Sequence, residues 1–122
     1  MEKLVRSGLL FDFYSGLLTE KQRNVLQLYY GEDWSLAEIA ETEGVSRQAV
    51  HDLLHRTERT MEDWESKLGL VKRFLEERQV LSEVADRISR LLAGLPHDNP
   101  LYREMADIHQ QVQNLLDSQA EE

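Results

Sequence analysis

The polar side chains best suited to bind a ligand gather in one stretch, VSRQAVHDLLHRTER, from Val45 to Arg59. Arginine can form two hydrogen bonds with a guanine edge, and glutamine can form two with adenine, so Arg47 and Gln48 are candidate base-reading residues. Arg56 and Arg59 are suited to backbone phosphates, to which Lys21 and Arg23 could add. The full set of candidate nucleic-acid-binding residues is Ser46, Arg47, Gln48, His51, Asp52, His55, Arg56 and Arg59.

Other chemistry is poorly supported by the residue types and their spacing. His51 and His55 are four residues apart and could share a metal ion, but no further Cys or His lies nearby in the sequence and the chain has no cysteine. We therefore expect a polar surface pair, with no metal site and no cofactor. A glycine-rich phosphate loop and a nucleophile elbow are also absent, so we predict that the protein is not an enzyme.

The elements that must hold the candidate residues form a helix-turn-helix. Ser35 and Glu38 are spaced as a capping box, and Ser46 is placed to cap a second helix. Between these helices, Ala40 allows close approach, and Gly44 falls where the turn needs a left-handed backbone. Apolar residues should anchor the motif, with one filling the corner: Leu36, Ile39, Val45, Val50 and Leu53.

Helical periodicity extends along nearly the whole chain, and no segment alternates convincingly as a strand. We predict an all-α protein with helices at roughly 2–15, 19–31, 35–43, 46–67, 70–93 and from 101 onward. A helix-turn-helix domain, winged-helix-like but without a wing, would cover 1–68. An antiparallel helical hairpin would cover 69–118, and 119–122 would form a frayed tail. The first helix should bury Leu4, Val5, Leu9, Phe11 and either Phe13 or Tyr14.

The hairpin has more apolar side chains than its own seam can bury. In its second helix the apolar residues are spaced alternately by four and three, and two further leucines end the first helix. The surplus predicts a subunit interface and hence a homodimer. The residues concerned are Leu91, Leu92, Leu101, Ile108 and Leu115.

The net charge of the chain argues against a phosphate-bearing partner, but most of the acidity lies in the C-terminal half, away from the candidate site, which weakens the objection. The formal net charge is −9. Residues 1–60 hold seven Lys/Arg and ten Asp/Glu, a net of −3, and residues 61–122 hold seven and thirteen, a net of −6. Four acidic residues lie in the segment after Arg56, against Arg59 and Lys67, and their repulsion should weaken phosphate binding there. They are Glu58, Glu62, Asp63 and Glu65.

Several stretches carry a resemblance to known families. Residues 18–60 resemble the promoter-reading region 4 of bacterial sigma factors. LLFDFYSGLLTEKQ, LYYGEDWSLAEIAE and VSRQAV together resemble the YlxM (UPF0122) family, over residues 1 to about 95. That family comprises small helix-turn-helix proteins of Gram-positive bacteria, encoded beside signal recognition particle genes. The resemblance implies a cytoplasmic, non-enzymatic protein that binds nucleic acid and acts in or regulates that pathway.

Three partners are therefore compatible with the sequence. DNA, bound by a regulatory protein, is the interpretation that we favour. The alternatives are the RNA of the signal recognition particle and a protein component of the same particle. No segment is long and apolar enough to span a bilayer, so we expect no membrane insertion.

Overall fold

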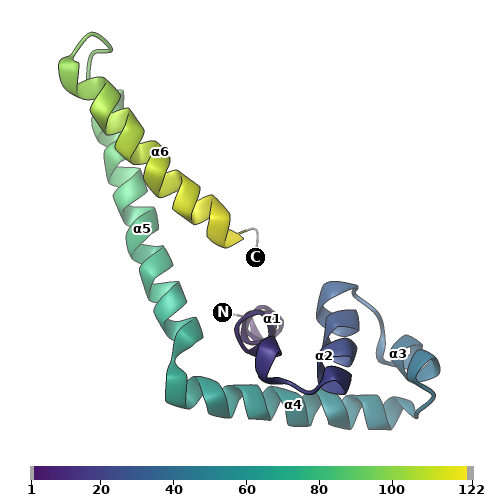
Figure 1. Ribbon diagram of the computed structural model, residues 1–122. Helices are drawn as coiled ribbons and strands as arrows, with labels where there is room; N and C mark the ends of the chain where they lie inside the picture. The colour runs from purple at the N-terminus through teal and green to yellow at the C-terminus, as the bar shows by residue number, and fades with distance from the viewer. Residues whose placement is uncertain (1, 121–122) are drawn as a thin grey trace. The chain divides into compact units, whose positions relative to one another are not determined.

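The computed structural model describes the backbone of residues 2–120 and the side chains of residues 2–118 (Figure 1). It contains no strand in this range, which confirms the all-α class. The chain divides into two compact units, residues 1–71 (unit 1) and residues 72–122 (unit 2). The helices are α1 (Lys3–Tyr14), α2 (Glu20–Leu26), α3 (Leu36–Glu43), α4 (Arg47–Leu68), α5 (Leu70–Ala93) and α6 (Pro100–Ala120).

Local capping chemistry sets the helix boundaries in unit 1. The Ser35 hydroxyl accepts a hydrogen bond from the Glu38 N–H at 3.1 Å, and the Glu38 carboxylate accepts one from the Ser35 N–H at 3.0 Å. Thr19 and Gln22 form the equivalent box before α2. Gly44, with φ of 69°, ends α3 in the left-handed conformation that glycine adopts without strain. The predicted capping box of Ser35 and Glu38 and the predicted glycine turn are confirmed.

One segment departs from the expected helix geometry. We expected α-helix up to Gly31, but α2 ends at Leu26 and Gln27–Gly31 is a π-helical segment. The Glu32 N–H reaches back to the Gln27 carbonyl at 3.1 Å, five residues earlier, and closes the wider turn. This segment carries Tyr29 and Tyr30.

The core of unit 1 forms where α1, α2 and α3 pack on α4. Its fully buried members include Leu10, Tyr14, Val25, Leu26, Ile39, Val50 and Met61. On α4 the inward positions are Val50 and Leu54, four residues apart, whereas Leu53 is only partly buried. The anchors expected at Ile39 and Val50 are confirmed, but Leu54 takes the position predicted for Leu53.

Three predicted core residues lie at the surface. Leu4 and Val5 are 63% and 53% exposed, because the face that α1 buries begins one turn later, at Ser7. Leu4 faces an open pocket rather than a packed helix. Val45 is 40% exposed. Its N–H, rather than its side chain, closes the corner of the helix-turn-helix by donating to the Ala40 carbonyl at 3.0 Å.

A buried carboxylate links three segments of unit 1. Glu65 Oε1 accepts a hydrogen bond from the Tyr14 hydroxyl at 2.6 Å and another from the Val71 N–H at 2.9 Å. The first contact joins α4 to α1, and the second holds the beginning of α5 after the left-handed Gly69, whose φ is 63°. Glu65, which we expected on an acidic solvated flank, is therefore a core residue.

Unit 2 is the expected hairpin of α5 and α6, joined by the loop at 94–99 (Figure 1). Ala85 and Leu116 are buried, and Arg78 donates to the Leu116 carbonyl at 3.1 Å. Asn99 caps α6 by accepting from the Leu101 N–H at 2.9 Å. Residues 119 and 120, predicted to fray, continue the α6 backbone, and 121 and 122 lie outside the described residues.

Candidate nucleic-acid interface

All eight predicted site residues are exposed, and Arg47–Arg59 occupy the first half of α4 directly after its N-cap. We call this set the α4 surface: Ser46, Arg47, Gln48, His51, Asp52, His55, Arg56 and Arg59. The helix end on which it begins carries partial positive charge and unpaired N–H groups, which favours an anionic partner. The left-handed turn at Gly44 and the buried Val50 hold that end against α3.

Hydrogen bonds within the α4 surface show which side chains hold the helix and which can contact a ligand. The Ser46 hydroxyl accepts from the Ala49 N–H at 3.0 Å, so it serves first as the helix cap. Gln48 donates to Asp52 at 2.9 Å, and this bond, followed by the one with His51, lowers the Asp52 pKa. Asp52 is thus an anion that orients the Gln48 amide. Within residues 2–118, no hydrogen bond or ion pair engages the Arg47 side chain.

Not every basic residue suggested for phosphate contact is available. The Arg23 guanidinium donates to the carbonyls of Ser15 and Leu18, at 3.2 and 3.0 Å, and so holds the connection between α1 and α2. Lys21 is exposed on α2. Arg56 donates weakly to the Asp52 carbonyl at 3.4 Å, which leaves most of its donors for a ligand.

The acidic flank after the α4 surface is largely engaged within unit 1. Two guanidinium nitrogens of Arg6 donate to Glu62 at 2.7 and 2.9 Å, and this pairing lowers the Glu62 pKa. Lys67 pairs with Asp63 at 3.1 Å. With Glu65 buried as well, the repulsion expected from this flank is smaller than a count of its charges indicates.

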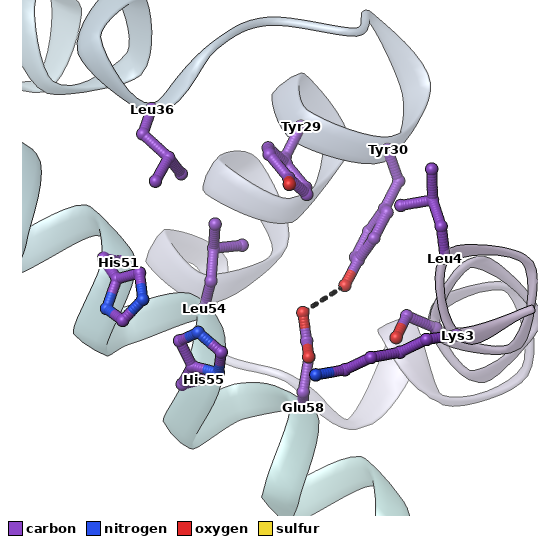
Figure 2. A pocket seen from close by; sticks show the side chains of 10 residues that line it. Lys3, Leu4, Tyr29, Tyr30, Leu36, His51, Leu54, His55 and Glu58 are labelled. Carbon is purple, nitrogen blue, oxygen red and sulfur yellow. Dashed lines mark hydrogen bonds between the residues drawn. The ribbon is translucent and has the colours of Figure 1, made fainter.

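The fourth acidic residue of the flank, Glu58, forms part of a pocket that the sequence did not indicate. Glu58 accepts a hydrogen bond from the Tyr30 hydroxyl at 2.6 Å (Figure 2). The pocket has a volume of about 410 Å³ and lies between α1, the π-helical segment, α3 and α4. His51 and His55 belong both to its wall and to the α4 surface. An adjacent tyrosine pair before a glycine, LYYG, was the available sequence signal.

The rings of His51 and His55 lie close together with their planes tilted by 57°, and among the described residues no third metal ligand joins them. Their ring centroids are 4.2 Å apart. In the described part of the chain, no group of three or more His, Cys, Asp or Glu residues could hold a metal ion. None of the described helices is long and apolar enough to cross a membrane.

The hydrogen bond between Tyr30 and Glu58 predicts that unit 1 loses stability at alkaline pH. Burial and this hydrogen bond raise the pKa of Tyr30. Because the folded pKa exceeds the unfolded value of about 10, the stabilisation is complete below about pH 10 and declines as the pH rises further. We expect the free energy of unfolding to be constant up to about pH 10 and to fall steadily as the pH is raised above that value. Urea titrations followed by circular dichroism measure this decline.

The matched variant for this prediction is Tyr30→Phe. It should be less stable than the parent near neutral pH but lose less on alkalinisation. The pKa of Tyr14 is also raised, by burial and by its bond to Glu65, so part of the decline should remain. Equal losses in parent and variant would contradict the assignment to Tyr30.

Comparison with known proteins agrees with this architecture. Residues 1–93 match the model of the UPF0122 family, described as "Putative helix-turn-helix protein, YlxM / p13 like". The match covers unit 1 and α5 to its last residue.

Full-length relatives carry the same family name. A UPF0122 protein of Geobacillus kaustophilus is 45% identical over 108 residues, covering 88% of this chain and 98% of the relative. One of Streptococcus gordonii is 44% identical over 108 residues, covering 88% and 92%. One of Desulforamulus reducens is 49% identical over 94 residues, covering 77% and 80%. With a helix-turn-helix in unit 1 and a family match over residues 1–93, the chain belongs to the UPF0122 family of helix-turn-helix proteins.

Proposed function

We propose that the protein binds nucleic acid, with duplex DNA as its first target, through the α4 surface. The observation that carries this proposal is the placement of Arg47 and Gln48. Both are exposed in the first turn of α4, on a helix end that the turn at Gly44 and the buried Val50 hold in place. Membership of a helix-turn-helix family supports the same kind of partner.

The proposed function is regulatory and not enzymatic. We propose a cytoplasmic regulatory protein that acts in the signal recognition particle pathway, as the resemblance of its sequence implies. Binding to the particle's RNA, or to one of its proteins, is the alternative outcome of the same experiments. A protein partner would contact the α4 surface without neutralising phosphates, so salt separates the two classes.

The experiment is a binding titration of the full chain on a labelled random duplex over a range of salt concentrations. If Lys21, Arg56 and Arg59 each contact one phosphate, the logarithm of the binding constant should fall with that of salt with a slope of about 3. A duplex and an RNA hairpin of equal length, titrated side by side, identify the preferred nucleic acid. No binding to either at low salt would refute the proposal.

A second proposal concerns the oligomeric state. Along α6, Leu101, Ile108 and Leu115 follow one another at intervals of seven residues and are 61%, 41% and 54% exposed. An apolar stripe with a seven-residue repeat is suited to packing against a second helix. In a two-fold symmetric dimer, the stripe of one subunit would pack against the same stripe of the other subunit. We propose a homodimer through this stripe, which would give a helix-turn-helix two copies of its reading helix.

We expect light scattering to give twice the chain mass of 14.3 kDa at micromolar concentration. Ile108→Asp should give a single chain mass and an unchanged helical circular dichroism spectrum, because it places a charge in the middle of the stripe. The control Asp107→Asn alters a neighbouring exposed position and should stay dimeric. A parent protein of 14.3 kDa that keeps its helical content would contradict the proposal.

A further inference from the structure

The pocket beside the α4 surface has the size and walls of a binding site for a small planar group. Its volume of about 410 Å³ falls within the range of small-molecule sites in proteins. Figure 2 shows Tyr29 and Tyr30 on one side of the space, His51 and His55 on another, and Leu36 and Leu54 around it. Four rings and two leucines therefore surround one opening.

Each ring that lines the pocket packs against another ring. Tyr29 packs edge-to-face on Tyr30, with centroids 5.2 Å apart, and Tyr30 is fixed in turn by its hydrogen bond to Glu58. The two imidazoles lie 4.2 Å apart on successive turns of α4. Flat faces in a fixed arrangement favour a flat ligand, which gains stacking energy without having to order the walls.

The polar groups of the pocket narrow the choice of ligand further. The pocket is lined by one carboxylate, that of Glu58, and one ammonium, that of Lys3, so it has no net charge that would favour an anionic group inside. The remaining acceptor positions of Glu58 suit an N–H donor. Lys3 and Ser7 supply donors from α1. A neutral, planar ring that carries an N–H group can form hydrogen bonds with all of these groups. Any anion attached to the ring would stay outside the pocket. An aliphatic side chain from a protein partner would leave the polar ones unpaired.

The position of the pocket connects it to nucleic acid. His51 and His55 line it and also belong to the α4 surface, so a strand bound there passes the opening. The π-helical segment that supplies both tyrosines is of a kind that occurs frequently at functional sites. Protein sites for unpaired bases combine aromatic or histidine stacking with hydrogen bonds to base edges.

We propose that this pocket receives one unpaired base of the nucleic acid bound at the α4 surface. The inference rests on the proposed function and adds a preference to it. The target contains, next to the segment that α4 contacts, a nucleotide that is single-stranded, looped out or at a strand end. DNA and RNA offer the same stacking chemistry, so the experiment must compare both.

The test uses the full chain and short single-stranded oligonucleotides, of DNA and of RNA, each with one fluorescent 2-aminopurine. Stacking in the pocket should quench the fluorescence, and unlabelled adenosine monophosphate should compete. Tyr29→Leu should weaken single-strand binding by about tenfold, the order expected for the loss of one stacked base, and leave duplex binding unchanged. Tyr29→Phe keeps the ring and should bind as the parent does.

Tyr102→Leu is the matched control, since Tyr102 lies on α6 and stacks on His97 outside the pocket. If Tyr29→Leu does not fold, Lys3→Met removes a pocket donor at an exposed position outside the α4 surface and should also weaken single-strand binding without changing duplex binding. Unchanged fluorescence, or single-strand affinity equal to the parent's in the folded pocket variants, would overturn this inference. If either of these results is found but the parent still binds a duplex with the expected salt dependence, the proposed function stands and only the inference about the pocket is wrong. Failure to bind any nucleic acid overturns both.

Discussion

Replacing Glu65 with alanine should lower the free energy of unfolding by about 3 kcal/mol, the largest effect we expect from a single polar residue in unit 1. The carboxylate accepts hydrogen bonds from the Tyr14 hydroxyl and the Val71 N–H, at 2.6 and 2.9 Å. Alanine leaves both donors without that acceptor and opens a small cavity where three segments meet. Urea unfolding of the full chain, followed by circular dichroism, measures the change.

Two variants separate this effect from a general loss of negative charge. Glu65→Gln keeps an acceptor oxygen and should lose clearly less stability than Glu65→Ala. Arg6→Ala removes the partner of Glu62 in an exposed ion pair, whose side chains are 40% and 46% accessible, and should cost less than about 1 kcal/mol. Similar midpoints for Glu65→Ala and Arg6→Ala would mean that the buried hydrogen bonds contribute little.

Features determined by neighbouring residues were predictable from the sequence. The capping box of Ser35 and Glu38 and the turn at Gly44 depend on spacings of three or four residues and on one backbone conformation. The end of α4 at Gly69 was predictable for the same reason, because glycine readily adopts the left-handed conformation that ends a helix. Exposure of the α4 surface also followed from helical periodicity, once Val50 was assigned to the inner face.

Features that depend on distant segments were not predictable in this way. Glu65 looked like its solvated neighbours, because the Tyr14 hydroxyl that makes its burial possible lies 51 residues earlier. Leu4 matched the apolar pattern of α1 but faces a pocket that three other segments leave open. The same pocket required the wider turn at Gln27–Gly31, and apolar periodicity does not distinguish a π-helical turn from an α-helical one.

Replacing Arg47 with alanine should weaken binding to the preferred nucleic-acid site by about 1–3 kcal/mol and binding to random sequence much less, because a base-edge contact exists only on the preferred site. Gln48→Ala should behave in the same way. Arg56→Ala and Arg59→Ala should weaken binding to all sequences alike and lower the salt slope by about 1 each. Titrations of the four variants on a selected site and on random duplex, each at several salt concentrations, provide the measurement.

Variants of Asp52 test whether the hydrogen bond between Gln48 and Asp52 matters for base contact. Its carboxylate accepts from the Gln48 amide at 2.9 Å and thereby limits where that amide can point. If Gln48 reads a base in the orientation that Asp52 imposes, Asp52→Ala should reduce discrimination between sites, even though it removes a negative charge and should strengthen random binding. Gln48→Ala should then cost less in the Asp52→Ala background than in the parent, because the two residues act on the same contact. Additive losses would mean that Gln48 acts independently of Asp52. Equal gains on the selected and random sequences would identify Asp52 as a repulsive charge alone.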